Sequence, residues 1–409
     1  MRPDDKIDLF KWIDHWVGVL VCSLLSLWER ASGPRDADSP QVVLDPPPKA
    51  ILIIKFFGLG SILLSAGLVR SIKERYPATR ILFLSFKENE EMLKILGLAD
   101  EIRVVDTRGP LRMACSILAN LVYFFRHRPD VAVDLEFFAK FSTLMAYLSG
   151  ARWRVGFCFN QLWRYPLVNV PVHFNHSRHI LEIYSQCGHA IGVDSVPALP
   201  PRLRLDGAER ESVQLLWSTL GLREDDLVLG VNVNASGLAY CRRWPRQRFA
   251  EVIGELLRED PRLKVLLTGT RDEQEYVAGV LPCLGEHTRG RVVDLAGALT
   301  LRQFLALLER LDVFLTNDSG PFHMAQIQRT PVVSIWGAGS PDLYGHLGPT
   351  SNRVIYKRWA CSPCLYIYRT DAGFFCRKRA CCLDGIESTE VAAAVRDLLG
   401  QRKRGAASL

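Results

Sequence analysis

The sequence predicts an α/β protein with two doubly wound, parallel-sheet lobes and a cleft between them. Three observations support this prediction. The chain has 409 residues, enough for two or three domains of about 150 residues each. Short β-type runs alternate with helical stretches of about 10–15 residues, the pattern of βαβ units. The alternation lapses in an extended, proline-rich stretch around residues 195–205, which indicates a boundary between the lobes.

Composition excludes several classes of protein. Hydrophobic residues make up 48% of the chain and charged residues 23%, as in ordinary globular proteins. The net charge of +7 is modest, and apart from the tail Arg402–Arg404 there is no Lys/Arg-rich block, so we expect no nucleic-acid partner. The start is acidic after Arg2, with no small-residue cleavage site, so we expect no secretory signal. Scattered cysteines in a large α/β chain are typical of a reducing compartment, which predicts a cytoplasmic protein.

Residues 1–30 are expected to form an amphipathic helix at a membrane surface. The apolar run from Trp16 to Trp28 is shorter than the about 20 residues that span a bilayer. One interpretation places the helix in the membrane interface with its tryptophans at headgroup depth. The other packs it on the protein's own core. The proline-rich linker, residues 31–49, favours the membrane because it detaches the helix. The polar or small residues of the helix recur every three or four positions and are Asp8, Lys11, His15, Gly18, Cys22 and Ser26.

Two lobes follow the linker, an acceptor lobe at residues 50–195 and a donor lobe at residues 206–386. Ligands of doubly wound sheets bind at the carboxyl ends of the strands, so candidate site residues are those that follow a strand. The expected strands are Ile51–Phe56, Arg80–Leu84, Glu101–Val105, Val131–Leu135, Leu227–Val233, Lys264–Leu267, Val292–Leu295, Val313–Thr316 and Val332–Trp336.

The clearest candidate motif, Thr316–His323, follows an apolar strand and opens a helix. Backbone N–H groups at such a helix start favour a phosphate; the alternative is that Asp318 only caps the helix. A small-residue loop, Asn232–Gly237, ends another strand of this lobe, and the paired arginines after it suit a diphosphate. The predicted donor- and phosphate-binding residues are Asn234, Ser236, Arg242, Arg243, Asp318, Ser319, Gly320, Pro321 and His323.

The first lobe opens with a strand, a glycine turn and a helix at Ile53–Ser61. The third glycine of the dinucleotide fingerprint is missing at the required spacing, which excludes an NAD site. A close approach of backbone to a ligand is still expected at this turn.

Residues 50–399 resemble glycosyltransferase family 9, the group that includes the ADP-heptose:lipopolysaccharide heptosyltransferases. The most specific parts are Asn317–His323 and Thr330–Val333, and Arg242–Pro245 is similar to the family's Lys-x-Trp-Pro segment. The resemblance implies a GT-B-like fold, with a last helix, residues 387–400, crossing back to the first lobe. It implies an inverting, metal-independent enzyme that needs no cofactor. Such an enzyme moves a heptose-like sugar from a nucleotide-diphosphate donor, ADP-heptose foremost, to a lipopolysaccharide-core or other lipid-linked glycan at the inner membrane surface.

One departure from the family concerns the catalytic base. The family's usual Asp after the glycine of the first turn is Ser61 here, and a serine is not an unassisted base at neutral pH. We hypothesise that Glu136, at the end of another strand, takes the acceptor's proton, with Ser61 and Lys55 as hydrogen-bond partners. The alternative is that Glu136 is a solvated carboxylate at the rim. The residues assigned to acceptor binding are Gly60, Lys140 and Arg154.

Two other functions stay open on the same fold, a non-catalytic nucleotide-sugar or glycan-binding homologue that lost the base, and a nucleotide-sugar epimerase. The cysteine-rich loop, residues 361–382, also has two interpretations. Its thiolates suffice for a four-ligand structural zinc site, or they remain free thiols. The zinc set would be Cys361, Cys364, Cys376 and Cys382.

Overall fold

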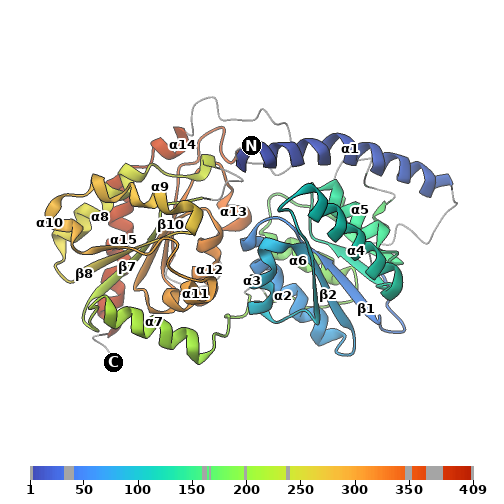
Figure 1. Cartoon of the computed structure of the whole chain (residues 1–409), viewed down its shortest axis with the longest axis horizontal. Coiled ribbons are helices and arrows are strands. Elements are labelled where there is room, and N and C mark those ends of the chain that lie inside the picture. Colours follow the sequence, from blue (N-terminus) through green and yellow to red (C-terminus); the bar gives the residue numbers. More distant parts are fainter. Residues whose placement is uncertain are drawn as a thin grey trace. The chain divides into compact units, whose positions relative to one another are not determined.

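The alternating strands and helices build two parallel six-stranded sheets. The computed structural model of the chain describes residues 3–31, 41–158, 164, 167–197, 200–235, 240–345, 352–364 and 381–406. The first of its two units extends to Pro201 and the second begins at Arg202. Helices cover the sheet of each unit (Figure 1). The predicted α/β class with two doubly wound lobes is therefore confirmed.

The sheet of the first unit has the strand order β3-β2-β1-β4-β5-β6. All neighbouring strands are parallel. The order reverses between β1 and β4, and ligands of such sheets bind at the carboxyl ends beside the reversal. The strands are β1 Ala50–Ile54, β2 Arg80–Phe86, β3 Glu101–Val105, β4 Val131–Asp134, β5 Trp153–Cys158 and β6 Val170–His173. The helices are α1 Pro3–Ala31, α2 Leu59–Arg75, α3 Glu90–Leu96, α4 Pro110–His127, α5 Lys140–Leu148 and α6 Ile180–His189.

The second unit repeats this topology with the order β12-β11-β10-β7-β8-β9, so its reversal lies between β7 and β10. The strands are β7 Leu227–Asn232, β8 Leu263–Thr268, β9 Val292–Asp294, β10 Val313–Asn317, β11 Val332–Trp336 and β12 Asn352–Tyr356. The helices are α7 Gly207–Thr219, α8 Arg246–Glu259, α9 Gln274–Ala278, α10 Glu286–Arg289, α11 Leu301–Arg310, α12 Gly320–Gln328, α13 Pro341–Tyr344, α14 Cys381–Asp384 and α15 Ser388–Ala406.

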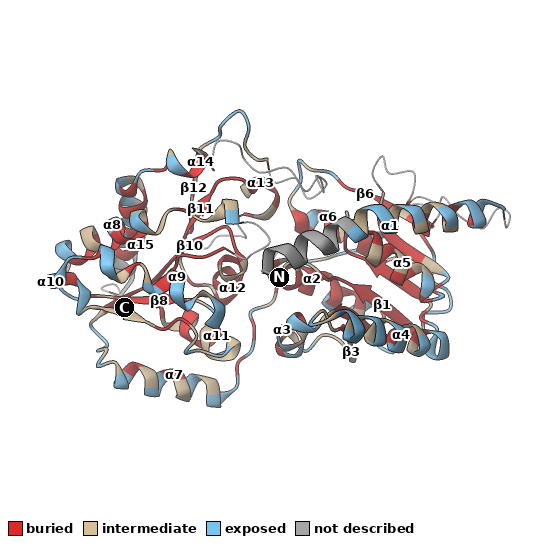
Figure 2. Cartoon of the chain, turned by 45° about the horizontal axis from the view of Figure 1, so that its top comes forward, coloured by how far each residue is buried: buried red, intermediate tan, exposed pale blue. Residues whose placement is uncertain are grey.

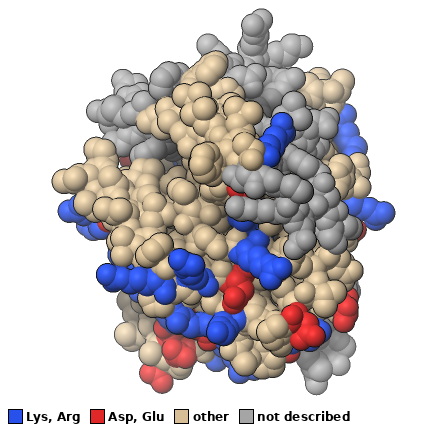
Figure 3. All heavy atoms as spheres, turned by 90° about the vertical axis from the view of Figure 1, so that its right-hand side faces the viewer, with Lys and Arg blue, Asp and Glu red and all other residues tan. Residues whose placement is uncertain are grey.

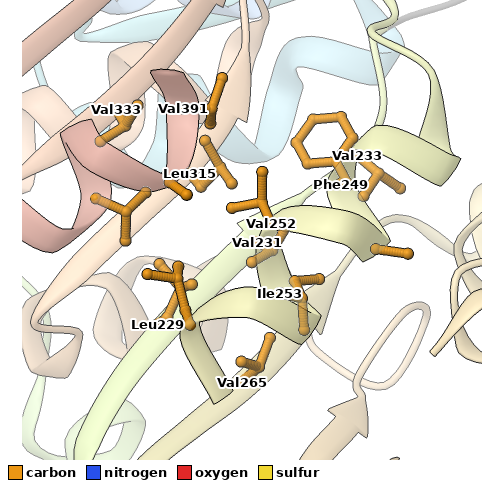
Figure 4. Close-up of a cluster of buried hydrophobic side chains, with 14 of the residues drawn as sticks. Leu229, Val231, Val233, Phe249, Val252, Ile253, Val265, Leu315, Val333 and Val391 are labelled. Atoms are coloured by element: carbon orange, nitrogen blue, oxygen red, sulfur yellow. The ribbon is translucent and has the colours of Figure 1, made fainter. Parts of the chain in front are cut away.

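The last helix, α15, packs in the core of the second unit. Val391 of α15 lies among Val231, Leu315 and Phe249, which come from β7, β10 and α8 (Figure 4). The buried residues of α15 continue to Leu399. The resemblance implied that residues 387–400 cross back to the first lobe. That placement is wrong for the buried residues of α15, from Val391 to Leu399. Their apolar stripe is buried next to α8 on the second sheet instead.

Three strands were not predicted from the sequence, namely β5, β6 and β12. An arginine and a glycine interrupt the apolar run of β5, and a proline stands in β6. β12 begins with Asn352 and Arg353. β6 and β12 lie at sheet edges, where a proline and polar residues are tolerated.

Helix α1 packs on α5 of the first unit, so the proline-rich linker does not detach it from the protein's own core. Cys22 and Ser26 of its polar stripe are buried. A Cβ added at Gly18 would lie 2.7 Å from the Lys140 Cβ. Seven large apolar residues of α1 lie on the opposite side and are exposed, namely Ile13, Trp16, Val17, Leu20, Leu24, Leu27 and Trp28. Figure 2 shows exposed positions along the described part of the helix. Among the described residues no helix combines the length and apolarity needed to cross a membrane.

Candidate functional site

Glu136 joins the ends of β1 and β4 in the first unit. Its Oε1 accepts hydrogen bonds from the backbone N–H groups of Phe56 and Phe57, both at 2.8 Å. The Lys55 ammonium lies 2.8 Å from the same oxygen, and both side chains are almost completely buried. Glu136 is therefore not a solvated rim carboxylate. Three donors fix one oxygen, while Oε2 has no hydrogen-bond partner among the described residues.

Asp134, at the end of β4, supports the segment that carries Glu136. One carboxylate oxygen accepts from Arg164 Nη2 at 2.6 Å and from the Ser142 and Thr143 hydroxyls. Burial raises the pKa of Asp134 to about 6, against the opposing effect of Arg164. Arg164 Nη2 also donates to the backbone carbonyl of Glu136 at 2.6 Å. Sequence analysis did not assign Arg164 to the site, because its pairing depends on tertiary contact.

The glycine turn that leads into α2 holds Ser61. Gly58 precedes the helix with φ of 82°, in the left-handed region that favours glycine. Gly60 is buried in the first turn of α2, and Ser61 follows it, half-buried. The two N–H groups that Glu136 binds belong to the residues just before this turn. Lys55 therefore pairs with Glu136 at the carboxyl end of β1, as predicted. A hydrogen bond between Ser61 and Glu136 stays a prediction.

Lys140 and Arg154, predicted to bind the acceptor, are engaged inside the first unit. Arg154 is buried and donates to the carbonyls of Leu167 and Ala151, while its Nη2 lies 3.2 Å from Glu29 of α1. Lys140 is buried at the start of α5 with its ammonium 3.8 Å from Asp14 of α1, and burial lowers the pKa of Lys140. Both residues hold α1 in place, so the structure gives no support for acceptor binding by them.

Asn317 ties the two central strands of the second unit together. Its side-chain Nδ2 donates to the backbone carbonyls of Val233 and Asn234 at 3.0 and 3.1 Å. Its Oδ1 accepts from the backbone N–H of Trp244 at 3.0 Å. Trp244 is itself buried and donates its indole N–H to the Ile386 carbonyl. The loops after β7 and β10 are thereby held side by side at the carboxyl edge of the sheet.

Asp318 pairs with Arg242 beside this junction. Arg242 Nη1 lies 3.4 Å from Asp318 Oδ1. Burial raises the pKa of Asp318, and the positive charge of Arg242 opposes that rise. A Cβ at Gly339 would lie 1.9 Å from Asp318 Oδ2, so only a glycine leaves room for the carboxylate. The N-cap of α12 is Ser319, so the interpretation of Asp318 as a helix cap is wrong.

Asn234 and Arg243 bring further polar groups to the same edge. Within the described part of the chain, neither Oδ1 nor Nδ2 of Asn234 has a hydrogen-bond partner, although the residue is buried. The Arg243 guanidinium lies 4.2 Å from the ring of Tyr240 and 4.5 Å from that of Tyr276, and its Nε donates to the Ala235 carbonyl. Ser236, also predicted for this site, lies outside the described residues.

Helix α12 begins where the prediction placed it. Ser319 caps the helix without a side-chain hydrogen bond to it, and Gly320 and Pro321 form its first turn. A glycine and a proline at these positions leave the helix start without large side chains. His323 lies one turn inside and is buried against Phe322. The structure thus gathers the described residues that were predicted to bind the donor around the ends of β7 and β10.

A sequence model of the family described as glycosyltransferase family 9 (heptosyltransferase) matches residues 131–370. This range covers more than half of the chain and includes both Glu136 and the Asp318 region. The chain belongs to glycosyltransferase family 9. The predicted family is therefore confirmed, on the segment that carries most of the candidate residues.

Two relatives of this chain are named as heptosyltransferases. Lipopolysaccharide heptosyltransferase 2 of Salmonella typhimurium is 29% identical over 146 residues, which is 36% of this chain and 40% of that protein. The match therefore spans less than half the length of that relative. Lipopolysaccharide heptosyltransferase 1 of Campylobacter coli is 22% identical over 362 residues, 86% of this chain and 99% of that protein.

Solved structures of the family share the fold. A family 9 glycosyl transferase from Veillonella parvula superposes with a TM-score of 0.71 at 22% identity, covering 89% of this chain and 100% of that one. The ADP-heptose lipopolysaccharide heptosyltransferase II of E. coli gives 0.66 at 22% identity, covering 87% and 99%. These likenesses confirm the GT-B-like fold of two parallel six-stranded sheets.

The cysteine-rich loop of this family 9 chain lies partly outside the described residues, and Cys376 is among the residues left out. Cys382 is buried and Cys361 exposed. The backbone N–H of Cys364 donates to the Ala338 carbonyl, just after β11. Within the described residues no group of three or more His, Cys, Asp or Glu side chains could hold a metal ion. Because Cys376 lies outside the described residues, the four-cysteine zinc site stays a prediction.

Proposed function

We propose that this chain transfers a heptose-like sugar from ADP-heptose to the core of lipopolysaccharide or to another lipid-linked glycan, with inversion at the anomeric carbon. The observation that carries the proposal is the set of polar groups at the ends of β7 and β10, in a chain of family 9 whose named relatives are heptosyltransferases. The acceptor hydroxyl would be held by the first unit.

The donor's diphosphate would bind at the start of α12. Backbone N–H groups of a helix start and the helix dipole favour a phosphate, and Gly320 lets it approach closely. Arg242 would supply the cation, since it lies beside Asp318 at this edge. The amide nitrogen and oxygen of the buried Asn234 have no partners among the described residues. A polar group of the donor would bind there, because a buried polar atom without a partner is costly. Because protein groups supply the positive charge, the proposal requires no metal ion and no cofactor.

Glu136 would act as the base. The acceptor oxygen attacks the anomeric carbon from the face opposite the nucleotide, the bond to the diphosphate oxygen breaks, and ADP leaves with the electron pair. The hydroxyl proton passes to Glu136 Oε2, the oxygen that has no partner among the described residues. The three donors on Oε1 orient the carboxylate. Oε2 is buried, so the acceptor reaches it only if the groups around it move.

A lipid-linked acceptor places the reaction at the inner face of the membrane. We propose a cytoplasmic chain held peripherally at that surface. The exposed apolar side of α1 supports this location.

Thermal unfolding with nucleotides tests the donor site. ADP at a hundred times its dissociation constant is expected to stabilise the protein by about 2.7 kcal/mol, with UDP, GDP and CMP giving less. Arg242→Ala removes charge-assisted hydrogen bonds worth about 1.5–3 kcal/mol, so ADP should bind that variant at least about tenfold more weakly.

Arg223→Ala is the matched control, because Arg223 is exposed and pairs with Asp225 ahead of β7. Its response to ADP should equal that of the wild type. Selective stabilisation by another nucleotide would show that the donor is a sugar linked to that nucleotide instead of ADP-heptose. The absence of any response would favour the non-catalytic interpretation of the fold.

A further inference from the structure

Helices α4, α5 and α1 form one layer on one face of the first sheet (Figures 1 and 2). Phe124 of α4 and Met145 of α5 share a buried cluster with Leu52 and Leu82, from β1 and β2. Arg154 is paired in register with Ala132 of the same cluster, so Arg154 points to this face too. Its bond to Glu29 places α1 over β5, next to α5.

Helix α1 is attached to this layer by its polar side. The Asp14 carboxylate accepts from the backbone N–H groups of Lys140 and Phe141 at 3.1 and 2.8 Å and so caps the start of α5. Near the other end of α1, Glu29 accepts from the Tyr147 hydroxyl at 3.0 Å and pairs with Arg154. These contacts fix which side of α1 faces outward. They also make α1 run parallel to α5.

The outward side of α1 is a strip of large apolar side chains. Its residues follow helical spacing and lie on the side opposite Gly18, Cys22 and Ser26. Trp16 and Trp28 are 61% and 68% exposed. The exposed members of this strip are Ile13, Trp16, Val17, Leu20, Leu24, Leu27 and Trp28.

Helix α4 carries a second strip on the same layer. Its exposed apolar residues are Leu111, Leu118, Val122 and Phe125, which share one side of the helix by their spacing. That side lies roughly opposite Phe124 and Asn120, which face the sheet. Exposed apolar strips of this kind are typical of a surface that binds a partner or a membrane. We call the two strips together the apolar face.

Charge at the edge of the apolar face indicates its partner. α4 contains no acidic residue. α1, α4 and α5 run parallel, so their carboxyl ends meet at one edge, where Arg30, Arg126 and Arg128 are exposed. The view onto this edge shows basic side chains gathered, among a few acidic ones, beside an area without charge (Figure 3). Arginines next to exposed tryptophans suit phosphate headgroups above an acyl boundary.

We propose that the apolar face binds the surface of an anionic phospholipid bilayer, with α1 and α4 lying in the interface and the arginines against the headgroups. The two strips would enter the acyl boundary to the depth of an interfacial helix, about 5–10 Å. The inference deepens the proposed membrane location and rests on it. It assigns membrane binding to a surface of two helices rather than to a detached N-terminal anchor.

Vesicle co-sedimentation of the full chain tests the inference without donor or acceptor, so a failure here leaves the transfer reaction untouched. Wild-type protein is expected to bind phosphatidylcholine vesicles that contain phosphatidylglycerol. The pair Leu20→Gln with Leu24→Gln, and separately the pair Leu118→Gln with Phe125→Gln, should each weaken binding at least about tenfold. Leu215→Gln on α7 of the second unit is the matched control, since Leu215 is 68% exposed, and should change nothing.

Replacing Arg30, Arg126 and Arg128 by Gln should weaken binding to the anionic vesicles and leave binding to pure phosphatidylcholine unchanged. The inference would be overturned if wild-type protein did not bind anionic vesicles. It would also be overturned if the pair Leu118→Gln with Phe125→Gln bound them as tightly as the wild type. A salt-stable dimer that the α4 pair dissociates, without vesicle binding by the wild type, would also overturn it and assign the face to a second copy of the chain.

Discussion

Glu136→Gln is expected to lower kcat by about 10²–10⁴-fold, the range that general base catalysis contributes. The amide keeps an oxygen that can accept from the N–H groups of Phe56 and Phe57. It leaves the buried Lys55 ammonium without its charge partner, so a loss of stability is expected beside the loss of turnover. It cannot take a proton from the acceptor hydroxyl. Steady-state kinetics with ADP-heptose and acceptor measure the change, and the midpoint of thermal unfolding shows whether the fold survives.

The control for this variant is Glu182→Gln, a substitution of the same chemistry at an exposed carboxylate of α6 that pairs with Arg178. It should leave kcat unchanged. ADP should stabilise Glu136→Gln as much as it stabilises the wild type, because the donor groups lie in the second unit. Turnover of Glu136→Gln within a few-fold of wild type would contradict the assignment, and Glu136 would then only hold the turn in place.

Lys55→Met is expected to destabilise the first unit by about 3–5 kcal/mol, the cost of removing one partner of a buried ion pair. Glu136 would be left with a buried charge and two backbone donors. For a unit of this size, thermal unfolding should begin roughly 6–20 °C lower, at about 2–4 °C per kcal/mol. Chemical denaturation followed by circular dichroism measures the loss of free energy.

Lys94→Met provides the matched control, because Lys94 pairs with Glu90 at the surface of α3. Such pairs contribute about 0–1 kcal/mol. The double variant Lys55→Met with Glu136→Leu removes both charges and should recover part of the stability lost in Lys55→Met alone. A Lys55→Met protein as stable as the control variant would show that the pair does not hold β1 and β4 together.

The alternation of apolar runs and helical patterns was sufficient to predict both sheets, because strands buried on both faces are almost continuously hydrophobic. It failed at β5, β6 and β12, where Arg154, Pro171 or Arg353 interrupts the run. In β5 the interruption is tolerated because Arg154 finds Glu29 and two carbonyls. A partner more than a hundred positions away leaves no local signal in one sequence.

The candidate site divides in the same way. Motifs next to strand ends, such as Asn317–His323, were correctly placed because the topology brings them to one edge. The surroundings of single side chains were not predictable. Lys55 was expected as a hydrogen-bond partner of Glu136 and is one, but the complete burial of the pair was not predicted. Lys140 was expected to meet the acceptor, and it lies beneath α1.

Product analysis after incubation with ADP-heptose and a heptose-free lipopolysaccharide core acceptor tests the central claim most directly. The account predicts release of ADP together with one new glycosidic bond, whose anomeric configuration is opposite to that of the donor linkage, and it predicts turnover when a metal chelator is present. An isomerised free donor without a new glycosidic bond, or intact donor after incubation with folded protein that binds ADP, would contradict the account.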